Sequence, residues 1–156
     1  MTDEKVNRRK PSGTPVLQTL AMPKDVNANG DIFGGWILSQ MDLAGGIMSK
    51  EITGSRTVTV TIDKMVFRLA VKIGDTVRIY ADLLRVGNSS MDLQLEVWAK
   101  NLPGEYSADR HLVTEGVFRY VAIDENGRPR HIPDNPQFFT RSGDTFERKI
   151  DDRPGN

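Results

Sequence analysis

The segment from Phe33 to Met48 constrains the fold more than any other part of the sequence. Hydrophobic residues recur in it at the three- and four-residue spacing of a helix, and others widen this stripe until little polar surface remains. A helix of this composition is buried on most of its sides, and Asp31 is its expected N-cap. The residues of the stripe are Ile37, Leu38, Met41, Leu43, Ala44, Ile47 and Met48.

Five segments around this helix have the composition of β-strands, one before it and four after it. In Met91–Ala99 hydrophobic residues alternate with polar ones, as in an antiparallel strand with one exposed face. Alternation in Arg56–Val66 predicts that every second residue from Val58 to Val66 lies on one face. The five segments are 16–20, 56–66, 76–84, 91–99 and 112–123.

This order of elements predicts an α+β fold in which a long central helix is wrapped by an antiparallel sheet of about five strands. Strands do not alternate with helices, which argues against a doubly wound parallel sheet. We expect a single domain over residues 14–133, after a mobile arm at 1–13 and before a loose or docked tail at 134–156. Because one sheet cannot cover the helix on every side, we expect two chains to pair.

Composition excludes several classes of function. Lys plus Arg and Asp plus Glu both number 21, so the net charge is zero and no dense basic stripe indicates a nucleic-acid binder. The chain has no cysteine, which rules out disulfides and a cysteine nucleophile. No apolar run approaches the roughly 20 residues of a membrane span, and we expect a cytoplasmic protein. The two histidines, His111 and His131, lack partners at metal-ligand spacing, so no metal is expected.

Two adjacent glycines, Gly34 and Gly35, stand at the predicted start of the helix. The first N–H groups of a helix have no internal partner and lie at the positive end of its dipole, so they can stabilise a developing oxyanion. Glycine there lets another group approach the backbone closely. Alternatively, the two glycines only permit tight packing of Trp36 against the sheet. The local sequence does not decide between the two interpretations.

Asp42 lies inside the apolar helix, where an ionised carboxylate is costly unless it is hydrogen-bonded or paired. Gly45 and Gly46 follow it, and each costs about 1 kcal/mol relative to alanine within a helix. One interpretation is a general base or nucleophile that faces a substrate, with the glycines leaving room. The other is a structural aspartate that bonds Ser39 or a neighbouring strand.

The spacing of Gly35 and Asp42 adds a geometric constraint. The seven residues from one to the other correspond to about 10 Å of helix rise. One reacting carbon cannot lie about 3 Å from both. If both act on the same carbon they come from different chains, which predicts an active site at a dimer interface.

Taken together, these residues resemble the bacterial acyl-CoA thioesterases of the hotdog superfamily, in the branch related to the brain-type acyl-CoA hydrolase. The resemblance covers roughly residues 14–133 and departs from the family at Arg68–Val71, where members often have proline. It is carried by Met22-Pro23, Asn27, Gly30-Asp31, Phe33-Gly34-Gly35-Trp36 and Gln40-Met41-Asp42, and later by Val58-Thr59-Val60, Met65-Val66-Phe67, Gly74-Asp75, Glu96-Val97-Trp98 and Phe118-Arg119-Tyr120-Val121-Ala122.

The resemblance implies hydrolysis of acyl-CoA to a free acid and CoA, without a metal or an organic cofactor. In the family, an aspartate matching Asp42 activates water or attacks the thioester. An asparagine matching Asn27, from the partner subunit, helps to hold the substrate or the water. Backbone N–H groups near Gly35 polarise the carbonyl. The working unit is a dimer, often assembled into a trimer of dimers.

Weaker candidates for contacts with the substrate are Gly34, beside the proposed oxyanion donor, and three polar side chains. Ser89 and Ser90 follow a turn and have the chemistry to bond a phosphate or a pantetheine amide. Arg68 has the charge to pair with a nucleotide phosphate. Serines in turns usually cap the backbone, and isolated arginines on strands are usually solvated.

Three other functions remain open at this stage. A non-catalytic hotdog protein would bind acyl-CoA as a sensor without turnover. A hotdog enoyl-CoA hydratase would use a histidine with a carboxylate, but neither His111 nor His131 lies near the helix in sequence. A structural interaction module would bind no acyl-CoA at all.

Overall fold

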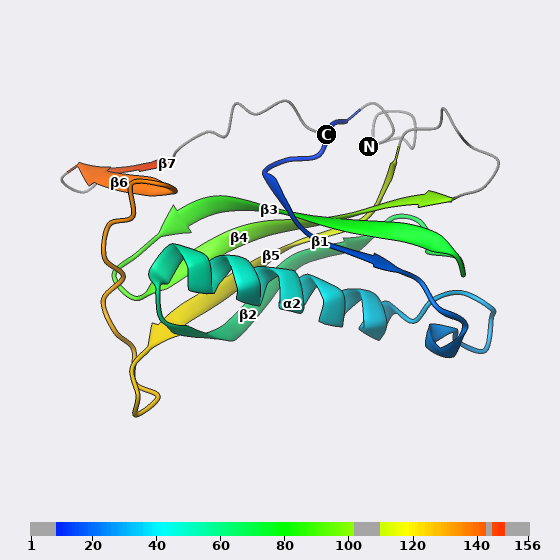
Figure 1. Cartoon of the computed structure of the whole chain (residues 1–156), viewed down its shortest axis with the longest axis horizontal. Coiled ribbons are helices and arrows are strands. Elements are labelled where there is room, and N and C mark those ends of the chain that lie inside the picture. The colour runs from blue at the N-terminus through cyan, green and yellow to red at the C-terminus, as the bar shows by residue number, and fades with distance from the viewer. Residues whose placement is uncertain (1–8, 102–109, 143–144, 149–156) are drawn as a thin grey trace.

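The computed structural model describes residues 9–101, 110–142 and 145–148, and Figure 1 shows their arrangement. The elements follow the predicted order, with one helix early in the chain and strands before and after it. Their bounds are β1 Thr14–Leu20, the short 3-10 helix η1 Pro23–Asp25, α2 Gly34–Thr53, β2 Arg56–Phe67, β3 Asp75–Val86, β4 Ser90–Asn101, β5 His111–Ile123, β6 Phe139–Ser142 and β7 Thr145–Arg148.

The first five strands form one sheet in the order β1-β3-β4-β5-β2, and every neighbouring pair is antiparallel. Helix α2 lies across one face of this sheet, as Figure 1 shows. The predicted fold class, a long helix against an antiparallel sheet of five strands, is therefore confirmed. Strands β6 and β7 form a separate two-stranded sheet.

The ends of α2 differ in how their backbone groups are satisfied. Gly54 ends the helix in the left-handed conformation, with φ 65°, and its N–H donates to the carbonyl of Lys50. At the other end Phe33 occupies the N-cap position and no side chain caps the helix. The prediction that Asp31 is the cap is wrong, because its carboxylate pairs with the ammonium of Lys72 instead.

One face of α2 packs on the sheet and forms the core. Its inward residues contact a continuous layer of side chains from β3, β4 and β5. Burying each of the isoleucine and methionine side chains among them contributes about 1.5–3 kcal/mol. Leu43 and Ile47 of the same helix stay 55% and 42% exposed. The buried hydrophobic residues of the helix are Ile37, Met41, Ala44, Met48 and Ile52.

The predicted alternation along β2 is wrong. Val58 pairs with Val121 whereas Ile62 pairs with Phe118, so the two β2 residues lie on opposite faces of the sheet. The pairing with β5 shifts between Thr59 and Thr61 and again between Asp63 and Val66. Each shift adds a residue to one strand and reverses which side the following side chains face.

The face of the sheet opposite α2 carries an ionic cluster. Glu96, with none of its side chain exposed, accepts hydrogen bonds from Arg9, the Ser12 N–H and the Trp98 indole. Arg9 also donates to Glu115 over 2.7 Å. Residues 9–13 are thereby connected to the sheet, while residues 1–8 of the predicted arm lie outside the described residues.

The first part of the predicted tail contacts its own chain. The Asn135 amide donates to the Ile52 carbonyl at the end of α2 over 3.1 Å. Arg141 donates to the Gly87 carbonyl in the turn between β3 and β4 over 2.8 Å, and Phe139 is buried. Residues 149–156 lie outside the described residues.

Candidate active site

Asp42 lies in the middle of α2 on its exposed side. Its Oδ1 accepts a 2.6 Å hydrogen bond from the hydroxyl of Thr59 on β2 and a 3.0 Å hydrogen bond from the hydroxyl of Tyr120 on β5. Ser39, the other partner considered, donates to the Trp36 carbonyl instead. The carboxylate is therefore held by the strands beside the helix.

Tyr120 is a buried tyrosine whose hydroxyl reaches the helix. Its side chain is 1% exposed, and its hydroxyl is also 3.3 Å from the Asp42 carbonyl oxygen. Burial, together with the nearby negative charge of Asp42, raises the pKa of Tyr120 above its usual value. The phenol therefore stays protonated at neutral pH and acts as a hydrogen-bond donor.

Of the two glycines after Asp42, one is explained within the chain. A Cβ on Gly45 would lie 2.0 Å from the Tyr120 hydroxyl oxygen, so only glycine lets the tyrosine reach Asp42. A Cβ on Gly46 would meet no atom within 4 Å. The space that Gly45 leaves is thus filled by Tyr120.

The start of α2 presents free backbone donors. The first helical hydrogen bond runs from the Ile37 N–H to the Phe33 carbonyl, so the N–H groups of the three preceding residues have no partner within the helix. Gly34 and Gly35 are exposed, and a Cβ on Gly35 would meet nothing within 4 Å. Packing inside one chain therefore does not require glycine at Gly35.

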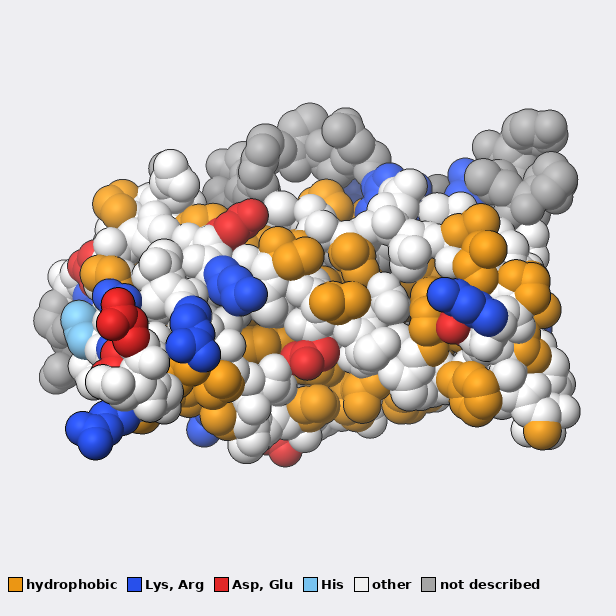
Figure 2. Space-filling view, turned by 60° about the horizontal axis from the view of Figure 1, so that its bottom comes forward, with side chains coloured by type: hydrophobic (Ala, Val, Ile, Leu, Met, Phe, Trp, Pro, Cys, Tyr) orange, Lys and Arg blue, Asp and Glu red, His pale blue; other side chains and the backbone are white. Residues whose placement is uncertain are grey.

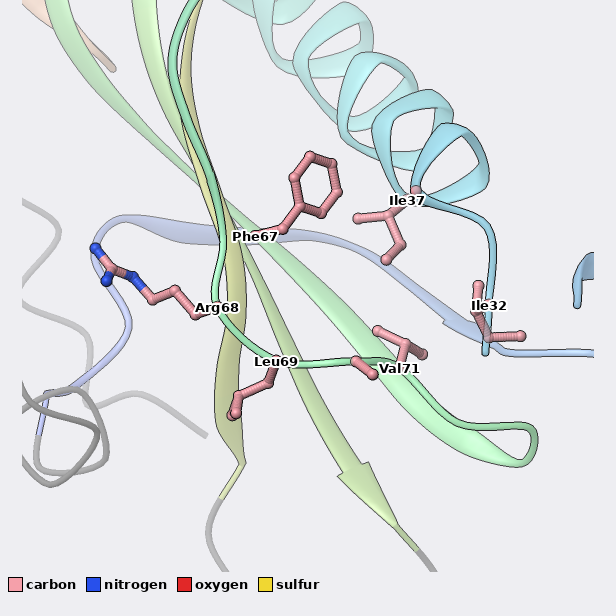
Figure 3. A pocket seen from close by; sticks show the side chains of 8 residues that line it. Ile32, Ile37, Phe67, Arg68, Leu69 and Val71 are labelled. Carbon is pink, nitrogen blue, oxygen red and sulfur yellow. The ribbon is translucent and has the colours of Figure 1, made fainter. Parts of the chain in front are cut away.

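A pocket of about 320 Å³ lies beside these donors, between the start of α2 and the segment that follows β2 (Figure 3). Five of its eight lining residues have large hydrophobic side chains that can contact a hydrocarbon chain. The side chain of Arg68 points away from the helix in Figure 3 and lies 3.6 Å from Glu115. The lining residues are Ile32, Gly34, Ile37, Phe67, Arg68, Leu69, Ala70 and Val71.

Asn27 organises the loop that leads into the helix. Its side-chain oxygen accepts hydrogen bonds from the N–H groups of Asn29 and Asp31, over 2.9 and 3.2 Å. The Oδ1 atom is therefore occupied by the loop, and the Nδ2 group is the part of the side chain that can donate a hydrogen bond to a ligand. Asn27 is half-buried, so a ligand has access to it.

The predicted contact residues do not all come together. Gly34, Gly35 and Arg68 lie at the end of the molecule where α2 begins. Ser89 and Ser90 lie at the opposite end, where Ser90 pairs with Val121 on the strand that runs beside the start of β2. There the Ser90 hydroxyl accepts a hydrogen bond from Arg85.

Sequence reasoning missed the hydroxyl pair of Thr59 and Tyr120. The signal was present, since a buried tyrosine needs a partner for its hydroxyl and Gly45 offers a gap in the helix. Predicting that Tyr120 fills the gap at Gly45 requires knowing how β5 is positioned against α2, and residue spacing along the chain does not give that position.

The part of the chain that the structure describes shows neither a metal-binding cluster nor a membrane-spanning helix. Within those residues, no three His, Cys, Asp or Glu side chains are grouped so that they could hold a metal ion. Among the same residues, no helix has the length and apolar character needed to cross a membrane.

Comparison with known proteins agrees with this geometry. Residues 29–104 match the model of the thioesterase superfamily. The chain is 50% identical over 127 residues to an uncharacterized acyl-CoA thioester hydrolase of Haemophilus influenzae, which covers 81% of this chain and 82% of the relative. It is 49% identical over 123 residues to the acyl-CoA thioester hydrolase YciA of Escherichia coli, covering 79% and 93%.

Solved structures give the same result. HI0827, a hexameric broad-specificity acyl-coenzyme A thioesterase, superimposes with a TM-score of 0.74 at 50% identity, over 80% of this chain and 84% of that one. The hexameric thioesterase y2039 of Yersinia pestis gives 0.76 at 50% identity, over 80% and 100%. Fold and site thus define a hotdog-fold thioesterase. The chain belongs to the thioesterase superfamily, among relatives named acyl-CoA thioester hydrolases.

Proposed function

We propose that this chain hydrolyses acyl-CoA to a free acid and CoA at a site built by two copies, with Asp42 as general base or nucleophile. Acyl-CoA hydrolysis is the activity for which relatives of about half identity are named. The observation that carries the role of Asp42 is its exposed carboxylate, held through one oxygen by two hydroxyls on the side of α2 that also exposes Leu43 and Ile47.

The surface around Asp42 supports pairing with a second copy. Figure 2 shows hydrophobic side chains across this side of the molecule, and apolar residues of α2 and β2 there remain exposed. Exposed apolar surface of this kind marks protein interfaces, and β2 is an edge strand with unpaired backbone groups. On the α2 side the exposed residues are Leu43, Ile47, Ile62 and Phe67, whereas Val58 and Val66 lie on the opposite face of β2.

The helix itself supports a site shared between chains. Gly35 and Asp42 are on one helix and about 10 Å apart along its axis, so one thioester carbon cannot contact both. In the proposed dimer, Asp42 of one chain faces the helix start and Asn27 of its partner. The solved relatives are hexameric, and we infer that three such dimers assemble here.

The proposed reaction follows from these groups. The partner's N–H groups at Gly35 stabilise the oxygen of the thioester carbonyl as negative charge develops on it. Asp42 either takes a proton from the attacking water or attacks the carbonyl carbon to form an anhydride that water then hydrolyses. The carbon–sulfur bond breaks, and the CoA thiolate leaves and takes up a proton. The Asn27 Nδ2 donor holds the substrate or the water.

The pocket and the polar candidate residues contact different parts of the substrate in this proposal. We infer that the pocket beside Gly34 takes the acyl chain or the pantetheine arm, because five of its lining side chains are hydrophobic and large. Arg68, at the outer side of that pocket, remains the candidate for a phosphate. Ser89 and Ser90 are distant from the helix start of their own chain, so any contact with CoA there involves another subunit.

Release of free thiol tests the proposal. Purified protein is mixed with acyl-CoAs from acetyl to palmitoyl in the presence of a thiol-reactive dye, with the Asp42→Asn variant alongside. Thiol release by the wild type that is lost in the variant is the expected result. Binding of acyl-CoA with no release from any member of the panel would favour the sensor, and hydration of an enoyl-CoA without thiol release would favour the hydratase.

A further inference from the structure

Two hydroxyl groups from different strands converge on one oxygen of Asp42. Thr59 is on the edge strand β2 and Tyr120 on its neighbour β5, and the two residues are directly paired across the sheet. Both donate to Oδ1, over 2.6 and 3.0 Å. Within the described residues, no hydrogen bond reaches Oδ2.

The fold makes specific room for this arrangement. Tyr120 reaches Asp42 only because Gly45, one turn further along α2, has no Cβ; that atom would lie 2.0 Å from the phenol oxygen and 2.6 Å from the ring carbon that bears it. A glycine within a helix is unfavourable compared with alanine. The chain therefore accepts a weaker helix at Gly45 in exchange for the contact with the carboxylate.

We propose that Tyr120 and Thr59 are positioning residues that hold the Asp42 carboxylate in its reactive orientation, with Oδ1 restrained and Oδ2 directed to the substrate. This inference rests on the proposed role of Asp42 in acyl-CoA hydrolysis. It assigns a function to Gly45 as well, since that residue admits the tyrosine.

The chemistry of the donors fits the role. A carboxylate that must accept a proton or attack a carbon needs a fixed orientation, because small misplacement of a reacting group is costly in rate. A lysine or arginine would neutralise the carboxylate. Neutral hydroxyl donors restrain it and leave its negative charge in place. The raised pKa of Tyr120, caused first by burial, keeps its phenol protonated so that it can donate.

A purely structural role is the alternative, since the Tyr120 hydroxyl also lies 3.3 Å from the Asp42 main-chain carbonyl. The two roles differ in what they change. A structural contact alters the melting temperature, whereas a positioning contact alters kcat with little change in KM or Tm.

The first test is Tyr120→Phe, with Tyr80→Phe as its control. Both tyrosines are buried in the same sheet, but Tyr80 lies on the side away from α2, with Trp98 and Leu112. We expect kcat of Tyr120→Phe for thiol release from acyl-CoA to fall about ten- to a hundredfold, the range for losing a hydrogen bond to a charged group. KM and Tm should stay close to wild type, and Tyr80→Phe should retain full kcat.

The second test combines Tyr120→Phe with Asp42→Asn. If the tyrosine acts through Asp42, the residual rate of Asp42→Asn should not fall further in the double variant. A further loss of equal size would show that Tyr120 acts independently and would overturn the proposal. So would a Tyr120→Phe variant within twofold of wild-type kcat. If wild type itself released no thiol, the proposed function would be wrong, a different outcome.

The third test uses Thr59 and does not depend on how the tyrosine variant folds. Thr59→Val keeps the shape of the side chain and removes the donor, while Thr59→Ser keeps the donor. We expect Thr59→Val to lose kcat at unchanged KM and Thr59→Ser to restore most of it. Equal kcat in the two variants would contradict the positioning role.

Discussion

Asp42 and Glu96 lie on opposite sides of the same sheet, and their carboxylates have different partners. Glu96 is fully buried and is bonded by the guanidinium of Arg9, the Ser12 N–H and the Trp98 indole. Asp42 is exposed and accepts only from two hydroxyls within residues 9–101 and 110–142. A carboxylate neutralised by a cation stabilises the fold, whereas one held by neutral donors in an open position stays available for chemistry.

The largest difference between the two carboxylates should appear in activity. Asp42→Asn keeps the size of the side chain and removes the base, so kcat should fall by about two to four orders of magnitude, the typical contribution of a general base. Tm should change little because the exposed carboxylate lies outside the core. Thiol release and calorimetry on the same preparation check both statements. A variant with near-wild-type turnover would remove Asp42 from the mechanism.

The next effect concerns the surface around Asp42 and the second copy proposed to cover it. Leu43→Asp places a charge on this exposed apolar surface. Because a twofold interface buries the change twice, the dimer should weaken by roughly three orders of magnitude or more. Light scattering measures the mass, and thiol release should fall with it. Leu84→Asp, at a leucine of β3 that is 42% exposed, is the control and should keep the assembly. Full activity in a monomeric Leu43→Asp would contradict the shared site.

Substitution of Glu96 should have a smaller effect, and it should change the stability of the fold and not the activity. Glu96→Gln removes the charge from the bond to Arg9, which should cost about 1.5–3 kcal/mol of unfolding free energy. Arg9 keeps its bond to Glu115, which limits the loss. Denaturant unfolding measures the cost, and kcat per folded site should stay close to wild type. A loss of kcat larger than the loss of stability would show that the two faces of the sheet are coupled.

The smallest effect should come from Asp92, whose pKa is lowered chiefly by its hydrogen bond from Arg119 and also by Arg85. A carboxyl with a lowered pKa in the folded state stabilises the protein above the unfolded pKa, near 3.8, and the stabilisation is lost as pH falls through the folded value. Asp92→Asn should therefore lower Tm slightly at pH 7, and the gap should narrow below pH 4. Thermal melts across that range check the sign; a gap that widened in acid would contradict it.

The sequence predicted most of the architecture because hydrophobic spacing determines it. The inward stripe of α2 follows from burial on one side and was confirmed. The exposed face predicted for β4 was wrong at Glu96 and Trp98, which are buried where residues 9–12 contact that face. The prediction failed where tertiary contacts override local pattern. The bulges of β2 reversed which side its residues face. The carboxylate of Asp31 forms an ion pair with Lys72 and does not cap the helix.

The candidate site was predictable in part for the same reason. Asp42 stands out because a charged residue in an apolar helix requires an explanation that the local sequence lacks. Tyr120 does not stand out, since tyrosines are common in strands and 78 residues separate it from its partner. Only the register of β5 against α2 brings them together.

Because Gly35 and Asp42 are separated on one helix, two inactive variants of this chain can restore activity when they form a mixed dimer. In the proposed dimer, each site takes its carboxylate from one subunit and its helix start from the other. A subunit defective at Asp42 and a subunit defective at Gly35, each inactive alone, would regenerate one intact site when they pair. Two damaged copies of this chain would thereby complement each other, with random mixing giving about a quarter of full activity.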